Sequence, residues 1–313
     1  MVVDRQSGGI QHSTMAALPS FVEPGSVLVL NNSRVRKARL MATAEGTGGR
    51  VEFLLLAEEE PGSWRFLSNR TRKQKPGKRY RFPGGLGGAL VEGEDGRLRL
   101  RFDEPIEEAY LDSHGLLPLP PYIKRPPTAA DEERYQTVFA EVAGSAAAPT
   151  AGLHFDRDLL EALRDRDAEV VFLTLHVGLG TFLPIRAQTV EEHEMHEERF
   201  CIPDETAQIV NRAREEKRPV LAVGTTVVRA LESACRRGDG SVQPGVSATD
   251  LFIYPGYEFR IVDRLLTNFH TPRSTLLVLV CAFAGKALIE RAYAAAVYER
   301  YRFFSYGGAM LLC

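Results

Sequence analysis

The stretch VVFLTLHVG at 170–178 is a continuous apolar run that ends in a histidine. Such a run is typical of a strand buried on both faces, as in a parallel sheet. Amphipathic helical patterns lie on both sides of it, RDLLEALRDRDAE at 157–169 and PDETAQIVNRAREEK at 203–217. Strands that alternate with helices predict an α/β architecture.

The same alternation continues in both directions along the chain. The expected strands are SVLVLNN (26–32) and PVLAVG (219–224), the expected hairpin is DLFIYPGYEFRIVD (250–263), and the expected helices are TTVVRALESACRRGD (225–239) and KALIERAYAAAVYERY (286–301). The first of these strands is too short to make a domain alone. We therefore expect it to join the sheet that the later strands form.

A polar cluster interrupts the segment LLTNFHTPRSTLLVLVCAFAG at 265–285. Thr267, Asn268 and His270 stand between a β-like run and an apolar helix, for which Thr271 is the expected cap. These side chains either satisfy backbone groups at the junction or face a ligand.

Residues 41–125 have a different pattern of hydrophobic residues and turns. Short alternating runs are separated, at intervals of about ten residues, by turn clusters such as EGTGG and KQKPG. This spacing predicts a small antiparallel β-barrel, which ends in the Pro-rich linker LLPLPPYIKRPP. We therefore predict an α/β main domain of residues 1–40 and 126–313, with a largely parallel or mixed sheet, and an inserted antiparallel β-barrel domain at 41–125.

Composition and charge are those of an ordinary globular protein. The 313 residues are 44% hydrophobic and 26% charged, with a net charge of −2, so any basic patch must be local. The four cysteines are isolated, the first residues lack a signal-peptide core, and the longest apolar run, 276–284, is too short to span a bilayer. We expect a reduced, cytoplasmic protein.

Common nucleotide and metal motifs are missing. VGLGTF at 177–182 lacks the third glycine and the helix start of a dinucleotide or methyltransferase fingerprint, and no P-loop occurs. In EEHEMHEERF at 191–200 the two histidines are three apart, and nothing is spaced to complete a zinc site. We predict no metal and no prosthetic group, and we keep His196 and Glu198 as candidate acid–base or ligand-orienting groups.

Polar side chains follow several expected strands, where ligands bind in open α/β sheets. The candidates are His176, Thr225, Thr226, Arg229, Tyr254, Asn268 and His270. Each also has a structural interpretation: a histidine can sit in a core, threonines can cap a helix, an arginine can form a surface ion pair, and a tyrosine can pack in a turn. The functional interpretation rests on their convergence.

Basic residues gather in two stretches of the chain. No acidic residue occurs between Arg65 and Arg81, and NSRVRKARL at 32–40 adds four more cations. One interpretation is a solvated strand face that discourages edge pairing. The other, which we favour, is a surface for RNA phosphates that includes Arg34, Arg36, Lys37, Arg70, Arg72, Lys73 and Lys75.

Taken together, these motifs resemble one family, the S-adenosylmethionine:tRNA ribosyltransferase-isomerases of queuosine biosynthesis. The segments that carry the resemblance run in order along the chain: LVLNNSRVRKARL, AAPTAGLHF, TLHVGLGTF, MHEERF, VGTTVVRALES, FIYPGYEFRIVDRLLTNFHTPRSTLLVLVCAFAG and YRFFSYGGAMLL. The family fold is an α/β domain that carries an inserted β-barrel, which agrees with the organisation expected above.

The resemblance implies an activity. The family's enzymes move the ribosyl part of S-adenosylmethionine onto a 7-aminomethyl-7-deazaguanine in the tRNA anticodon and isomerise it, which gives epoxyqueuosine-tRNA, adenine and methionine. S-adenosylmethionine is thus a substrate, no metal is implied, and the tRNAs are those with GUN anticodons. We expect a monomer.

The resemblance also suggests roles for individual residues. The C5′ proton beside the sulfonium needs a base, for which we expect His176 or His270, with Glu198 as the candidate carboxylate. Arg229 would pair with the methionine carboxylate of the donor. The remaining candidates would position the donor or stack on a base, and they are His154, Thr225, Thr226, Tyr254, Asn268, Ser305 and Tyr306.

The sequence departs from the family pattern at three places. Asn32 and Gly308 stand where the family usually has aspartate, and a DLP…LIA segment that precedes the first strand in the family is not seen here. Two other functions are therefore weighed: a tRNA-binding protein without catalysis, and a different S-adenosylmethionine enzyme such as an RNA methyltransferase. The missing methyltransferase fingerprint argues against the latter.

Overall fold

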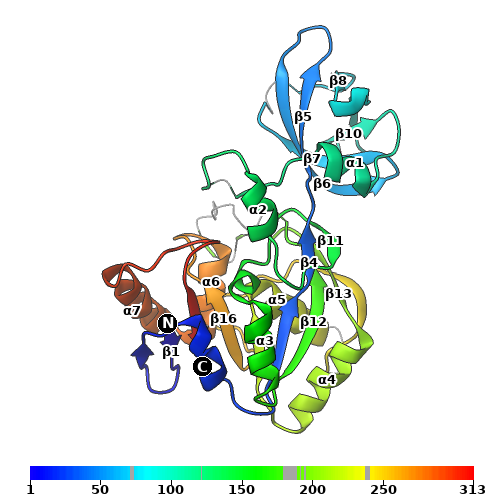
Figure 1. The fold of residues 1–313 in the computed structure, drawn as a ribbon. Helices are drawn as coiled ribbons and strands as arrows, with labels where there is room; N and C mark the ends of the chain where they lie inside the picture. The colour runs from blue at the N-terminus through cyan, green and yellow to red at the C-terminus, as the bar shows by residue number, and fades with distance from the viewer. Residues whose placement is uncertain (71–73, 121, 179–188, 191, 194, 237–239) are drawn as a thin grey trace. The chain divides into compact units, whose positions relative to one another are not determined.

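A computed structural model describes residues 1–70, 74–120, 122–178, 189–190, 192–193, 195–236 and 240–313 (Figure 1). The chain forms two compact units. Unit 1 is Met1–Arg34, Tyr135–Val142 and Ala148–Cys313, and unit 2 is Val35–Arg134 and Ala143–Ala147. Unit 2 begins before and ends after the expected barrel range of 41–125, and its status as a separate domain stays a prediction.

The described residues of unit 1 build a nine-stranded mixed sheet. In spatial order the strands are β15 (Gly245–Thr249), β13 (Glu198–Ile202), β12 (Glu169–Leu175), β3 (Val27–Asn31), β14 (Val220–Val223), β16 (Arg264–Asn268), β17 (Ala309–Leu312), β1 (Val2–Val3) and β2 (Ile10–Gln11). The four central strands β12, β3, β14 and β16 are parallel to one another, whereas β13, β15 and β17 run antiparallel to a neighbour. The predicted α/β class with a largely parallel or mixed sheet is confirmed.

β3 lies in the interior of this sheet, between β12 and β14. Val29 pairs with Val171 on one side and with Ala222 on the other. Leu28 and Leu30 pack on one face with α3 (Arg157–Arg164) and the 3-10 helix η1 (Met15–Phe21) (Figure 1). Every residue of β3 is buried, which is the reason that its sequence is apolar without alternation.

Four further α-helices are described in unit 1, and they come after β13, β14 and β16 along the chain. They are α4 (Asp204–Glu215), α5 (Thr225–Arg236), α6 (Thr275–Ala284) and α7 (Lys286–Tyr298), with a 3-10 helix η4 (Thr150–His154). α4 and α5 both pack against β3, β12 and β14. Among the described residues, every helix is too short or too polar to span a bilayer.

Two local predictions in this unit are wrong. α6 is capped by Ser274, whose hydroxyl accepts from the Leu277 N–H at 3.2 Å, and not by Thr271, because Arg273 has a left-handed φ of 59° that breaks a helix there. The expected hairpin at 250–263 turns at Pro255–Gly256, but it contains no strands. The buried carboxylate of Glu232 accepts hydrogen bonds from the backbone of this segment in place of a partner strand.

Unit 2 contains a closed six-stranded antiparallel barrel, as predicted. Its strands are β5 (Arg39–Ala44), β6 (Arg50–Glu60), β7 (Ser63–Ser68), β8 (Arg79–Arg81), β9 (Gly87–Glu92) and β10 (Leu98–Phe102), accompanied by the 3-10 helix η3 (Pro83–Gly85) and by α1 (Glu108–His114) and α2 (Ala129–Arg134). Short strands β4 (Ser33–Val35) and β11 (Val142–Ser145) lie where the chain passes between the units.

Candidate active site

The parallel strands of unit 1 end at one edge of the sheet, which we call the carboxyl edge. It comprises Asn31, His176, Thr225, Thr226, Asn268 and His270. The Gly224 N–H, just before α5, donates to the Leu266 carbonyl at 2.8 Å and so joins the ends of β14 and β16. The structure therefore places five of the predicted site residues at one edge of the sheet, namely His176, Thr225, Thr226, Asn268 and His270.

Asn31 connects the ends of two strands at this edge. Its amide nitrogen donates to the Leu175 carbonyl at 2.9 Å and its amide oxygen accepts from the Leu175 N–H at 3.0 Å. The same nitrogen lies 3.5 Å from the Thr226 hydroxyl. Because both polar atoms of this buried amide are hydrogen-bonded to Leu175, Asn31 holds β3 and β12 in register at the residue that precedes His176.

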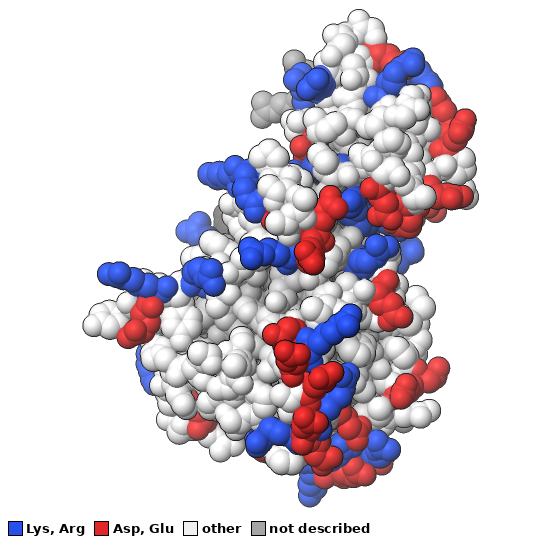
Figure 2. Space-filling model, in the orientation of Figure 1, with Lys and Arg blue, Asp and Glu red and all other residues white. Residues whose placement is uncertain are grey.

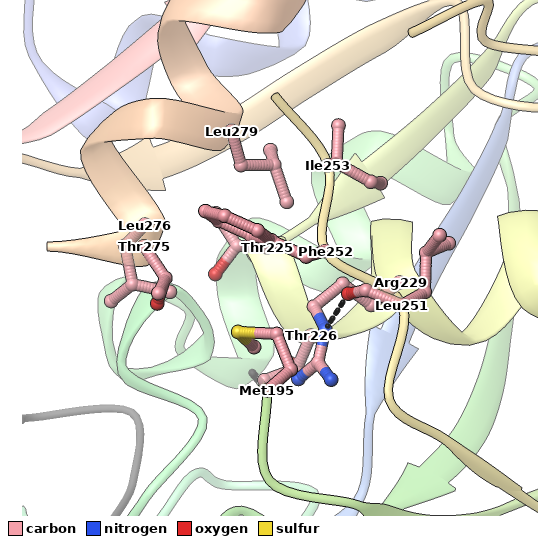
Figure 3. Close-up of a pocket in the computed structure, with 10 residues that line it drawn as sticks. All are labelled: Met195, Thr225, Thr226, Arg229, Leu251, Phe252, Ile253, Thr275, Leu276 and Leu279. Atoms are coloured by element: carbon pink, nitrogen blue, oxygen red, sulfur yellow. Dashed lines mark hydrogen bonds between the residues drawn. The ribbon is translucent and has the colours of Figure 1, made fainter. Parts of the chain in front are cut away.

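A small pocket, which we call the α5 pocket, opens at the start of α5 (Figure 3). Its lining residues are Met195, Thr225, Thr226, Arg229, Leu251, Phe252, Ile253, Thr275, Leu276 and Leu279. Its interior space is about 10 Å³, the scale of a single water molecule. Leu251, Phe252 and Ile253 come from the segment that was expected to be a hairpin.

Arg229 forms a buried ion pair with Glu198 beside this pocket. Both side chains are 5% exposed. The guanidinium also donates to the carbonyls of Leu251, at 2.9 Å, and Thr249, at 3.3 Å, while the second Glu198 oxygen accepts from the Gly178 N–H at 2.8 Å. Burial of two charges is tolerated here because they are paired and hydrogen-bonded. In this structure the guanidinium of Arg229 is paired with Glu198.

Thr267 and His270 satisfy one another within the interior. The Thr267 hydroxyl lies 2.9 Å from His270 Nε2, and the His270 N–H donates to the Tyr293 hydroxyl at 2.8 Å. Burial lowers the pKa of His270 to about 4, so its ring is neutral at pH 7. These two side chains therefore bond to one another, and not to backbone groups at the junction, in the part of the chain that the structure describes.

Asn268 is different, because one polar atom of its side chain has no hydrogen-bond partner among the described residues. Its amide nitrogen donates to the Phe304 carbonyl at 3.0 Å and to His154 Nε2 at 3.2 Å. Its amide oxygen is buried and has no hydrogen-bond partner among the described residues. Burial and the amino-terminal charge lower the pKa of His154 to about 4, so that ring accepts this bond in its neutral form.

The other predicted residues lie in varied surroundings. His176 is half-buried, and its backbone N–H donates to the Arg199 carbonyl at 3.0 Å, which extends the pairing of β12 with β13. Ser305 is buried, whereas Tyr254 and Tyr306 are 38% and 36% exposed. His196 is exposed, and no group of three His, Cys, Asp or Glu side chains in the described part of the chain is suited to a metal.

The sequence did not single out Glu232. This residue of α5 is fully buried, and its carboxylate accepts from the backbone N–H groups of Arg260, Ile261 and Val262 and from the Tyr257 hydroxyl. A signal was present, because Glu232 and Arg229 are the two charged residues in the otherwise uncharged stretch TTVVRALESAC at 225–235.

Comparisons with known proteins agree with the motifs at the carboxyl edge. A family model described as queuosine biosynthesis protein matches residues 1–312. The chain belongs to this family. Proteins named S-adenosylmethionine:tRNA ribosyltransferase-isomerase from Treponema denticola and Natranaerobius thermophilus are 46% and 49% identical over all of this chain and 92% and 91% of theirs.

A solved structure is also similar to this member of the queuosine biosynthesis family. It is described as S-adenosylmethionine tRNA ribosyltransferase from Thermotoga maritima, is 34% identical, and has a TM-score of 0.54. The match covers 100% of this chain and 91% of that one. The family resemblance seen in the sequence is thereby confirmed.

The structure gives a physical context for one departure from the family pattern. Asn32 accepts from the Thr174 hydroxyl at 2.6 Å and donates from its amide nitrogen to Glu141 Oε2 at 3.2 Å. An aspartate here would place two carboxylates against each other, which disfavours the charged form of both. Asparagine thus suits the presence of Glu141.

Gly308 is the second departure, and it lies in a crowded turn. A Cβ atom at this position would lie 3.0 Å from Cδ1 of Tyr301. A side chain such as aspartate would therefore require the Tyr301 ring to shift.

The predicted RNA-binding residues are partly neutralised. In unit 2, Arg36 is paired with Glu108 and lies over the Trp64 ring, and Lys37 pairs with Glu132 at 2.7 Å. Figure 2 shows Lys and Arg side chains mixed with Asp and Glu over the face that is drawn. Arg70 and Lys75 are exposed and Arg34 is half-buried, whereas Arg72 and Lys73 lie outside the described residues.

Proposed function

We propose that this family member transfers the ribosyl part of S-adenosylmethionine to a 7-aminomethyl-7-deazaguanine in tRNA and isomerises it to the epoxyqueuosine form, with release of adenine and methionine. The observation that carries the proposal is the convergence of the family-like motifs on the carboxyl edge. S-adenosylmethionine is a substrate in this reaction, and the chain's own side chains supply the proton transfers.

His176 is our choice for the base that removes the C5′ proton. It is half-buried at the carboxyl edge, so a substrate can reach it. His270 is less suited, because a pKa of about 4 makes it a weak base and Thr267 already occupies its Nε2 atom.

Asn268 and the residues around it are proposed to hold the donor. The buried amide oxygen of Asn268 suits a hydroxyl donor, such as those of a ribose, since a buried acceptor without a partner is costly. Thr225 and Thr226 open α5, where backbone N–H groups favour an anionic group. His154 keeps the Asn268 side chain in position through their 3.2 Å contact.

The Glu198–Arg229 pair is proposed to shape the site rather than to bind the donor. Through its hydrogen bonds it ties Gly178, after β12, to Thr249 and Leu251, beside the α5 pocket. Loss of either charge would leave the other buried without a partner. It would also release the hydrogen bonds that connect Gly178 with Thr249 and Leu251.

The tRNA contacts, the GUN anticodon preference, the cytoplasmic location and the monomeric state are further parts of the proposal. They are supported by the family membership and, for the RNA surface, by the exposed Arg70 and Lys75. Stacking of Tyr306 on a base is supported by its 36% exposure.

The test is to incubate the chain with S-adenosylmethionine and a tRNA that carries the aminomethyl-deazaguanine. Released adenine and the mass of the modified nucleoside are then measured. We expect both products from the wild type, loss of both from His176→Ala, and wild-type activity from His114→Ala, an exposed histidine of unit 2. No adenine and no mass gain, with tRNA still bound, would instead support the binding-only alternative, and label transferred from the donor's methyl group would support a methyltransferase.

A further inference from the structure

A second, larger cavity lies next to the α5 pocket. Its volume is about 420 Å³, within the range of small-molecule sites. The side chains that line it include Arg236, Phe252, Tyr254, Tyr257, Glu258 and Arg260, and we call this space the arginine cavity. Phe252 lines both the arginine cavity and the α5 pocket, so the two are neighbours.

Glu232 orders the chain segment 257–262, which forms one wall of the arginine cavity. One carboxylate oxygen accepts from the N–H groups of Ile261, at 3.0 Å, and Val262, at 3.1 Å. The other accepts from the Arg260 N–H at 3.0 Å and from the Tyr257 hydroxyl at 3.2 Å. Because Glu232 is fully buried, these bonds give segment 257–262 one defined path before any ligand arrives.

The cavity combines positive charge with an open aromatic face. Arg236 and Arg260 are exposed, and neither forms an ion pair within 4.0 Å in the described part of the chain. Glu258 supplies one negative charge against these two positive ones. Tyr254 is 38% exposed and lies against Phe252 with ring centroids 5.6 Å apart.

This combination matches the chemistry of a nucleotide. Guanidinium groups bind phosphate through charge-assisted hydrogen bonds, and an exposed tyrosine offers a surface on which a base stacks. RNA loops are recognised in this manner, since their unstacked bases are accessible.

We propose that the arginine cavity binds one nucleotide of the tRNA loop next to the reacting base, with Arg236 and Arg260 on its phosphate and Tyr254 on its base. The assignment rests on the proposed function, which brings an RNA loop to the carboxyl edge, where Thr225 and Thr226 also line the neighbouring α5 pocket. It differs from the predicted basic surface because it lies in unit 1. The same groups could serve the carboxylate and adenine of the donor, and the experiment separates these two sources.

The experiment measures binding of an unmodified anticodon stem-loop RNA by fluorescence anisotropy, without S-adenosylmethionine and over a range of salt concentrations. Arg236→Gln and Arg260→Gln are each expected to weaken binding several-fold and to reduce the slope of log K against log salt by about 0.7. Tyr254→Ala is expected to weaken binding roughly five-fold or more. Arg166→Gln, which removes an exposed arginine at the end of α3 away from the cavity, is the matched control and leaves the affinity and the slope unchanged.

The outcomes are separable from those of the activity assay, because RNA binding is measured without turnover. Unchanged RNA affinity and salt slope in all three variants would overturn the assignment even if the wild type is active. A raised KM for S-adenosylmethionine with unchanged RNA affinity would also overturn it, and would show that the cavity binds S-adenosylmethionine instead. Reduced RNA affinity in the variants would support the assignment even if the wild type releases no adenine.

Discussion

Replacement of Glu232 by leucine is expected to destabilise unit 1 strongly. The carboxylate accepts four hydrogen bonds from segment 257–262, and the N–H groups of Ile261 and Val262 that it satisfies are themselves buried. Leucine has a similar volume but accepts none of these bonds. Among the residues that the structure describes, no strand pairs with this segment to replace them.

The magnitude follows from the number of donors left unsatisfied. Each buried donor without a partner costs about 1–3 kcal/mol, and three backbone N–H groups lose their acceptor. The hydrophobic gain from a buried leucine, about 1.5–3 kcal/mol, offsets part of this cost. With about 2 kcal/mol for each of the donors and about 2 kcal/mol for the leucine, we expect the free energy of unfolding to fall by about 4 kcal/mol. For Glu232→Gln, which keeps one accepting oxygen, we expect a fall of about 1–2 kcal/mol.

Urea unfolding followed by far-UV circular dichroism is the suitable assay. The single tryptophan, Trp64, lies in unit 2, so its fluorescence does not report on unit 1 directly. Glu290→Gln is the matched control, because Glu290 is 65% exposed in a surface ion pair with Lys286 and should change stability by less than about 0.5 kcal/mol. If Glu232→Leu were no less stable than this control, the carboxylate could not be what satisfies the segment.

Three further predictions concern the carboxyl edge and the groups around it. Arg229→Met leaves Glu198 buried and unpaired, so we expect a loss of about 3–5 kcal/mol in urea unfolding together with loss of adenine release, while adding Glu198→Leu restores stability but not activity. The folded pKa of His270, about 4, lies below its ordinary 6.5, so the unfolded chain binds the extra proton between these values. Stability should therefore fall as pH is lowered through that window, and His270→Gln should flatten the fall in a pH series of unfolding curves. Asn31→Ala removes both bonds to Leu175 and should cost about 2–4 kcal/mol by urea unfolding, and a change below about 0.5 kcal/mol would contradict the role assigned to Asn31.

Local patterns in the sequence predicted the architecture well. The apolar run at 170–178 forms the buried strand β12, and the turn-rich region after residue 40 forms the closed barrel. Periodicity and turn chemistry act between residues that are close in sequence, so they can be recognised without knowledge of the fold. The family motifs likewise run in order along the chain, which is the reason that family membership could be inferred from the sequence.

The expected hairpin at 250–263 shows where local reasoning stops. Its alternating residues favour strands, yet the N–H groups of Ile261 and Val262 are bonded to Glu232, about thirty positions earlier in the chain. The choice between a partner strand and a carboxylate depends on what the folded chain brings alongside.

The sequence by itself determined the α/β class, the barrel, the family and the set of polar residues at strand ends. The tertiary structure alone decided their partners. Arg229 meets Glu198, 31 positions away, and Asn31 meets Leu175, 144 positions away. A buried charge or amide bonds to whatever group the packed chain places within about 3 Å, and no local pattern encodes that distance.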